Sequence, residues 1–226
     1  MINVVTFLWG SKYRAEHVNA LRRQLDLYYH EAGLICVTNQ PEGIDPRVKI
    51  VADTEDFADM RSPHGASFPS CYRRLRIWRS DAAQWFGERF VCIDLDVLAV
   101  GDLRPLWDRA EPIVLYRDPL YGGTGQYCGS MVLLTAGAAP EVWDDFTPTL
   151  GPMNARTAGF RGSDQAWISY RLRGATLPSW STADGVYSYR KDIMPRGGKL
   201  PADARLTIWH GGVKPWDSKL EWARAA

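Results

Sequence analysis

The stretch that decides the fold is Phe90-Val91-Cys92-Ile93-Asp94-Leu95-Asp96-Val97-Leu98. A short apolar run, typical of a buried strand, ends here in the Asp-x-Asp motif of Asp94 and Asp96. In extended backbone, residues i and i+2 point to the same side, so both carboxylates can approach one cation. Mg²⁺ and Mn²⁺ prefer oxygen ligands and complete their shells with substrate phosphates. The stretch therefore predicts a strand that ends at a metal–phosphate site; a strand-end cap and a solvated turn acid are the alternative.

The rest of the chain alternates strands and helices. Apolar runs predict strands over residues 2–8, 34–38, 48–51, 112–116, 130–135 and 206–209. Helical spacing predicts helices over residues 13–30, 70–85, 140–147 and 163–173, and residues 102–107 form a short helix or a turn. We expect loops over 62–69 and 174–204, with two short strands near Thr176 and Val186, and a flexible glycine-rich segment over 119–129. This order predicts one α/β domain with a mixed, mostly parallel central sheet that is flanked by helices and binds ligands at the carboxyl ends of its strands.

Composition narrows the function classes. The 226 residues suffice for one sizeable core, and 46% apolar and 23% charged residues are globular values. A formal net charge of +1 gives no basic footprint for a nucleic-acid partner. No apolar stretch approaches the roughly 18 residues of a membrane span, so we expect no integral membrane segment. The four cysteines are scattered and mostly lie in apolar runs, which favours buried thiols and a cytoplasmic location.

A second candidate motif follows the last predicted strand, in Ile208-Trp209-His210-Gly211-Gly212-Val213-Lys214-Pro215-Trp216. His210 can offer a neutral imidazole nitrogen to a metal. Gly211 and Gly212 let backbone approach a ligand closely, and Lys214 can neutralise a phosphate. The alternative is an exposed histidine on a turn beside an ordinary surface lysine.

Two further motifs carry charge on predicted helices. Four arginines lie between residues 73 and 79, and forked guanidinium groups suit a diphosphate, although a solvated basic helix face has the same pattern. Asp164-Gln165 begins a helix after Gly162-Ser163. Either a helix N-cap or an acid–amide pair facing a substrate explains it.

Together and in this order, these pieces resemble the family 8 glycosyltransferases of the GT-A fold. The resemblance runs from Val4 to Trp216. It rests on Arg74-Leu75, the metal segment from Phe90 to Leu106, Asp164-Gln165, and His210 with Lys214-Pro215-Trp216. It implies a single glycosyltransferase domain over residues 1–226, with a nucleotide-binding part over about 1–110 and a sugar- and acceptor-binding part over about 111–226.

The resemblance also implies roles. Asp94, Asp96 and His210 would hold Mn²⁺ or Mg²⁺ against the diphosphate of a nucleotide-sugar donor, most simply a UDP-sugar. Tyr13 would stack on the base, Arg74 would contact donor phosphate or sugar, and Lys214, with Gly211 and Gly212, would bind the phosphates. Asp164 and Gln165 would lie by the reacting face, where a carbohydrate or other hydroxyl acceptor attacks. The family is a hexosyltransferase family that retains anomeric configuration.

The chain departs from the family pattern in three places. The loop between His210 and Lys214 is two residues shorter than usual, and Tyr127-Cys128-Gly129 stands where Asn-x-Gly is usual. The region from Pro178 to Ala204 matches no part of the pattern. Two other functions therefore stay open. A haloacid-dehalogenase-like phosphatase would use Asp94 as nucleophile, although that family expects Thr or Val at the position of Leu98. A catalytically degenerate nucleotide-sugar- or carbohydrate-binding protein would keep the fold without the reaction.

Overall fold

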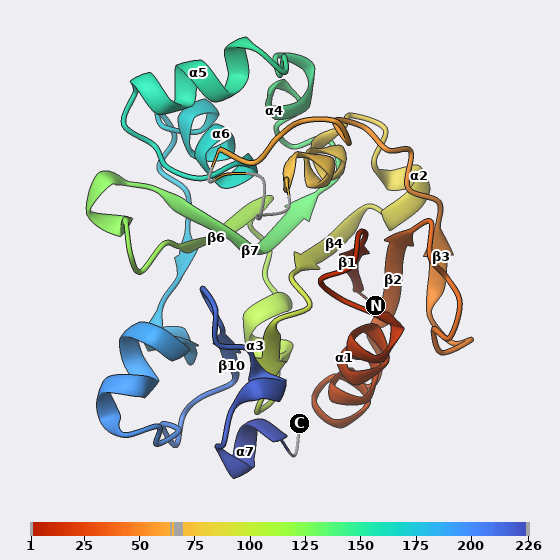
Figure 1. The fold of residues 1–226 in the computed structure, drawn as a ribbon, viewed down its shortest axis with the longest axis vertical. Helices are drawn as coiled ribbons and strands as arrows, with labels where there is room; N and C mark the ends of the chain where they lie inside the picture. Colours follow the sequence, from red (N-terminus) through yellow and green to blue (C-terminus); the bar gives the residue numbers. More distant parts are fainter. Residues whose placement is uncertain (1, 64, 66–69, 225–226) are drawn as a thin grey trace.

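The computed structural model describes residues 2–63, 65 and 70–224, and a seven-stranded sheet forms its centre (Figure 1). The strand order is β3-β2-β1-β4-β7-β6-β8. The strands are β1 (Asn3–Leu8), β2 (Gly33–Thr38), β3 (Lys49–Val51), β4 (Arg89–Ile93), β6 (Ile113–Arg117), β7 (Tyr127–Thr135) and β8 (Ser179–Trp180). Neighbouring strands are parallel except where β7 pairs with β4 and β6. The predicted mixed, mostly parallel α/β sheet is confirmed.

A small second sheet ties the C-terminal segment to the acidic stretch. Its order is β5-β10-β9, formed by β5 (Val97–Ala99), β10 (Leu206–Ile208) and β9 (Val186–Ser188). Because β10 runs antiparallel to β5, with Ile208 opposite Val97, the residues after β10 return toward the residues before β5. The backbone N–H of Trp209 donates to the Asp96 carbonyl at 3.3 Å.

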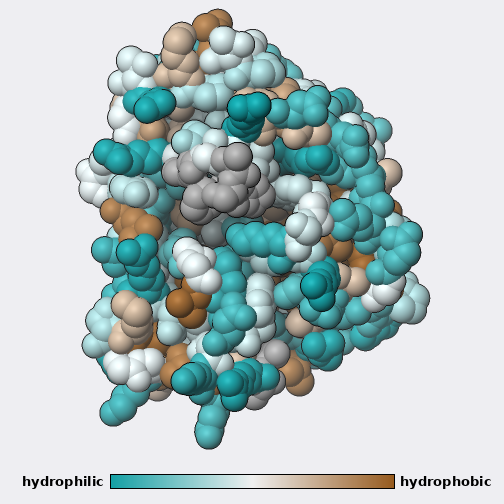
Figure 2. Space-filling view, viewed as in Figure 1, coloured by the Kyte–Doolittle hydropathy of each residue, from teal (hydrophilic) through white to brown (hydrophobic). Residues whose placement is uncertain are grey.

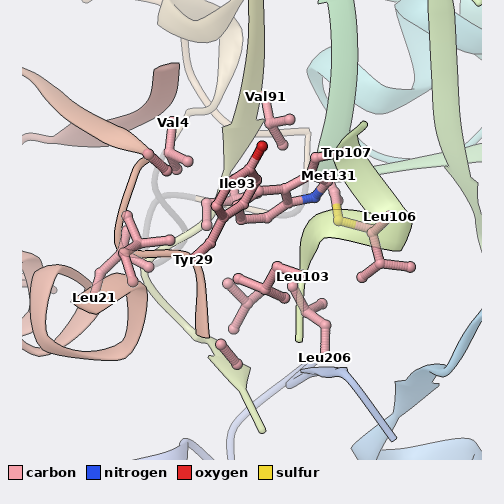
Figure 3. Close-up of a cluster of buried hydrophobic side chains, with 14 of the residues drawn as sticks. Val4, Leu21, Tyr29, Val91, Ile93, Leu103, Leu106, Trp107, Met131 and Leu206 are labelled. Atoms are coloured by element: carbon pink, nitrogen blue, oxygen red, sulfur yellow. The ribbon is translucent and has the colours of Figure 1, made fainter. Parts of the chain in front are cut away.

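Helices cover both faces of the central sheet. Successive side chains of a strand point to opposite faces, so Val4 and Val5 of β1 belong to different core clusters. The first face packs against α1 (Ala15–Tyr28) and α3 (Arg104–Trp107); Figure 3 shows Val4, Val91 and Ile93 together with Trp107 from α3. The second face packs against the 3₁₀ helix Tyr72–Trp78, α2 (Ala83–Phe86), α4 (Glu141–Asp144) and α6 (Asp164–Arg171), and α5 (Leu150–Thr157) lies against α6.

Several predicted elements differ from those observed. The predicted helix over 70–85 is wrong as one element, since a 3₁₀ helix over Tyr72–Trp78 is followed by a break and then α2. Six of the seven residues in that 3₁₀ helix are buried, so surrounding contacts, not an amphipathic pattern, decide its shape. The segment over 119–129 is not wholly loop, because β7 begins at Tyr127. Residues 64 and 66–69 of the predicted loop over 62–69 lie outside the described residues.

In the C-terminal half, α5 and a single π-helical turn over Tyr189–Ile193 were not anticipated, and α7 (Glu221–Arg224) follows the last loop. No helix formed by the described residues is both long enough and apolar enough to cross a membrane. No disulfide joins the four cysteines, all of which the structure describes. Figure 2 shows a face that is largely hydrophilic, with hydrophobic residues scattered over it.

Candidate active site

The loop that carries Asp94 and Asp96 lies between β4 of the central sheet and β5 of the small sheet, and both sheets hold it in place. Asp94 directly follows β4, and its backbone N–H donates to the Ser130 carbonyl of β7 at 3.1 Å. Asp96 directly precedes β5 and receives the Trp209 N–H described above. Both carboxylates therefore emerge at the carboxyl end of β4, as the sequence predicts.

Arg74 is the buried centre of the first charge cluster. The residue is 8% exposed, and its guanidinium donates to a carboxylate oxygen of Asp94 through Nη1; the same nitrogen donates to the Gly129 carbonyl at 3.1 Å. Nε and Nη2 lie 2.9 and 2.7 Å from Asp164 Oδ2. Desolvation raises the pKa of Asp94, and the Arg74 charge opposes that rise. Arg74 thus binds the end of β4 to the start of α6.

Glycine at position 129 makes room for this arginine. A Cβ there would lie 2.6 Å from Arg74 Nη2 and 3.3 Å from Asp164 Oδ2. The first distance is shorter than real Cβ contacts, so a larger residue would force the guanidinium out of place. Of the family's Asn-x-Gly pattern, the chain retains the glycine, and the structure gives that glycine a packing reason.

Lys214 and Tyr13 form the second cluster on Asp96. Lys214 is 8% exposed, and its ammonium donates to Asp96 Oδ2 and lies 3.4 Å from the Trp209 carbonyl. The Tyr13 hydroxyl donates to the same carboxylate oxygen at 3.0 Å. Desolvation and the Asp96 charge raise the pKa of Tyr13, so its hydroxyl stays protonated as a donor.

A pocket of about 110 Å³ joins the two clusters. Its lining comprises Phe7, Trp9, Lys12, Tyr13, Cys71, Arg74, Asp94, Leu95 and Asp96. Desolvation and the nearby Lys214 charge lower the pKa of Lys12. A second, more open hollow of about 450 Å³ lies between the residues that follow β1 and β2, and Tyr13 lines both. The tyrosine therefore separates a charged pocket from a larger open one.

His210, which lies in the loop that follows β10, carries an unsatisfied nitrogen. Its Nε2 is buried and has no hydrogen-bond partner among the described residues. The ring stacks on Tyr116 with centroids 6.3 Å apart, and Nδ1 lies 4.0 Å from Cys128 Sγ. Desolvation lowers the pKa of His210, which favours the neutral imidazole that binds metals.

The side chains at the site are of the chemical types that bind a divalent cation. Asp94 and Asp96 offer carboxylate oxygens, and His210 offers an unpartnered buried nitrogen. Within the described part of the chain, however, no three His, Cys, Asp or Glu side chains are gathered as a set of metal ligands. Arg74 and Lys214 hold the two carboxylates instead, so a cation would have to displace protein charges.

Asp164 and Gln165 begin α6 but face different neighbours. Asp164 is 2% exposed and accepts hydrogen bonds from Arg74 and, at 3.1 Å, from the Ser163 hydroxyl. The Gln165 amide lies 3.4 Å from Asp118 Oδ2 and 3.3 Å from the Arg161 carbonyl. Asp164 thus belongs to the Arg74 cluster, whereas Gln165 belongs to a separate polar network.

The sequence interpretation missed three residues of the site. Asp118 is 3% exposed and follows the apolar strand β6, the same signal that identified Asp94. Lys12 lines the charged pocket from the loop after β1, where nothing distinguishes it from a surface lysine. The packing role of Gly129 depends on a contact with a residue 55 positions away and has no local signal.

Gly211 and Gly212, which follow His210, have empty space where a side chain would lie. Gly211 adopts φ +85, a conformation that favours glycine, and a Cβ at Gly211 or Gly212 would meet no atom within 4 Å. The short loop that they form delivers Lys214 to Asp96.

Comparison with known proteins gives structural likeness alone. No protein-family model and no curated protein matches the chain. Among solved structures, the galactosyltransferase LgtC in complex with donor and acceptor sugar analogues superimposes with a TM-score of 0.67 at 13% identity, over 99% of this chain and 96% of LgtC. An active-site mutant of LgtC, with a glutamine replaced by glutamate, gives 0.64 at 12% identity, over 99% and 93%. The glycosyltransferase GlyE of Streptococcus pneumoniae TIGR4 gives 0.62 at 12% identity, over 97% of this chain and 57% of GlyE. The chain therefore has the GT-A fold of these glycosyltransferases, from one end of its sheet to the other.

Proposed function

We propose that the protein is a glycosyltransferase that moves a hexose from a UDP-sugar to a hydroxyl acceptor, with retention and with Mn²⁺ or Mg²⁺ bound by Asp94, Asp96 and His210. One observation carries the proposal. Tyr13, Arg74 and the Asp94–Asp96 pair come from separate parts of the sequence and line one pocket at the carboxyl ends of the strands, and Lys214 pairs with Asp96. Ligands of open α/β sheets bind at this edge.

The two hollows suit the two halves of a nucleoside diphosphate. The open hollow lined by Tyr13 would take the base and ribose, with the tyrosine ring as a stacking surface. The charged pocket would take the diphosphate, with Lys12 in its lining and Lys214, which pairs with the lining residue Asp96, as the cations. Arg74 is saturated by two carboxylates and the Gly129 carbonyl, so we assign it the orientation of Asp94 and Asp164, a change from the direct donor contact that the resemblance implies.

The reaction requires stabilisation of the departing diphosphate. A divalent cation bound by the carboxylates and the imidazole would supply Lewis-acid stabilisation of that charge. The Lys214 ammonium adds a positive charge beside the same oxygens. The acceptor hydroxyl attacks the sugar carbon on the face that the diphosphate leaves, the carbon–phosphate oxygen bond breaks, and the hydroxyl proton passes to the departing phosphate oxygen. Asp164 and Gln165, at the start of α6, would border the acceptor.

The fold gives the phosphatase alternative no support, because its expected nucleophile Asp94 is held by Arg74 in a sheet that matches glycosyltransferases over nearly its whole length. The test of the proposal is a thermal-shift panel of nucleotide sugars with and without Mn²⁺, followed by a transfer assay that measures release of the nucleoside diphosphate. Ligands that bind the native state raise its melting temperature by mass action.

We expect a UDP-sugar to give the largest shift, in the presence of metal, and to be consumed when a suitable hydroxyl acceptor is added. Asp94→Asn should abolish turnover. Full metal-dependent transfer by Asp94→Asn would remove the basis of the proposal. Binding of UDP without transfer of any UDP-sugar would instead identify a nucleotide-sugar-binding protein.

A further inference from the structure

The ion pair between Lys214 and Asp96 affects how the site can bind a divalent cation and a diphosphate. Lys214 is buried, and its ammonium donates to Asp96 Oδ2, the oxygen that the Tyr13 hydroxyl also contacts. Its one other acceptor among the described residues is the Trp209 carbonyl, at a long 3.4 Å. The ammonium and a divalent cation are therefore rivals for Asp96.

The charges around the pocket are balanced by the chain itself. Lys12, Arg74 and Lys214 supply three positive charges against Asp94, Asp96 and Asp164, all at or beside the pocket. A divalent cation alone would add two uncompensated positive charges to this buried group, which is costly in a low dielectric. A nucleoside diphosphate restores the balance and offers phosphate oxygens to a displaced ammonium.

The short loop between His210 and Lys214 keeps the Lys214 ammonium within reach of both Asp96 and a bound diphosphate. Lys214 follows His210 by four residues, and a Cβ on the intervening Gly211 or Gly212 would meet no atom within 4 Å, so this part of the loop is not packed against other residues on its side-chain side. The ammonium can therefore leave Asp96 without disturbing β10, which ends at Ile208. Such a group can pass from a carboxylate to a phosphate as the site fills.

We propose that Lys214 couples the binding of the divalent cation to that of the diphosphate: it competes with the cation for Asp96, and the diphosphate relieves the competition by accepting the ammonium. This inference rests on the proposed function for its ligands. It goes beyond phosphate binding by the lysine, because it predicts that the lysine weakens the binding of metal alone. Coupling between two ligands is reciprocal, so each must raise the affinity of the other by the same factor.

The test measures metal binding, not turnover. Free Mn²⁺ is titrated by electron paramagnetic resonance against wild type and Lys214→Met, each with and without saturating UDP. A charge-assisted hydrogen bond lost from Asp96 corresponds to about a tenfold change in affinity. We therefore expect Lys214→Met to bind Mn²⁺ alone about tenfold more tightly than wild type does, and to gain less affinity from UDP.

Lys12→Met is the matched control. It removes one positive charge from the pocket that Asp96 also lines but breaks no hydrogen bond to Asp96, so through-space repulsion should change the affinity for Mn²⁺ by only about twofold. Lys214→Arg keeps the charge and should resemble wild type. If Lys214→Met does not fold, Lys214→Gln gives the same comparison with a polar side chain.

Two outcomes overturn the coupling. In the first outcome, the Lys214→Met variant binds Mn²⁺ no more tightly than wild type or the Lys12→Met variant does. In the second outcome, the affinity of the wild-type protein for Mn²⁺ is the same with and without UDP. Either could occur in a protein that still transfers sugar, so the transfer assay separates failure of this inference from failure of the proposed function.

Discussion

Removal of the Arg74 guanidinium tests how the site is held together. Arg74→Met keeps an unbranched side chain of similar length but removes the donors to Asp94, Asp164 and the Gly129 carbonyl. Asp164 is 2% exposed, so its carboxylate would be left buried without its main counterion. Removing one partner of a buried ion pair costs about 3–5 kcal/mol, because the other charge remains desolvated.

The expected shift is large for a chain of this length. Each kcal/mol lowers the melting temperature by about 2–4 °C in domains of 150–250 residues, so Arg74→Met should melt about 6–20 °C below wild type. The assay is thermal and urea denaturation followed by circular dichroism. Arg104→Met is the control, since Arg104 pairs with Asp102 at the surface, with exposed fractions of 58% and 39%. An exposed pair contributes about 0–1 kcal/mol.

A second substitution, Asp164→Asn, tests whether the loss of stability in Arg74→Met comes from the unpaired Asp164 carboxylate. Asp164→Asn in the Arg74→Met background removes the carboxylate charge that the first change leaves unpaired, so the double variant should be more stable than the sum of the single changes predicts. Two results would refute this reasoning: Arg74→Met that melts as little below wild type as Arg104→Met does, or additive single changes. The buried cluster would then contribute no more than a surface pair.

Three further changes test other parts of the structure. Gly129→Ala forces a Cβ against the buried guanidinium and should lower the unfolding free energy by about 1–3 kcal/mol in urea titrations, whereas exposed Gly174→Ala should leave it unchanged or slightly higher. Tyr13→Phe loses the hydrogen bond to Asp96, so stability should fall by about 1–2 kcal/mol while the thermal shift by UDP persists; loss of that shift would contradict a stacking role for the ring. Burial raises the pKa of the Cys36 thiol to about 12, so the unfolded chain releases this proton first and stability should fall as pH rises from about 9 toward 12. Cys36→Ala should make that decline shallower, and an unchanged slope of unfolding free energy against pH would show that the thiol ionises normally.

Local patterns sufficed for the sheet. Strands such as β1 and β4 are continuous apolar runs because both of their faces are buried, and such runs are visible without a partner. The acids at the end of β4 were found for the same reason, since polar residues directly after a buried strand lie at the ligand-binding edge. Asp118 after β6 carries the same signal and was missed.

Elements shaped by their surroundings were not predictable. The segment over 70–85 reads as one amphipathic helix, yet Arg74 and Arg76 both turn inward to distant acceptors and the chain forms a 3₁₀ helix. A helical period assigns one face to solvent, and here nearly every side chain is buried. The π-helical turn after β9 likewise depends on packing that no local spacing shows.

The sequence by itself determined which side chains could form a charged site: two acids after a buried strand, an arginine-rich segment, an acid at a helix start, and a histidine and a lysine near the C-terminus. Only the tertiary structure decided how these charges pair, with Arg74 between Asp94 and Asp164 and Lys214 on Asp96. The physical reason is that pairing depends on distances across β4, β7 and β10, which are set by strand order and register. Spacing along the chain carries no information about those distances.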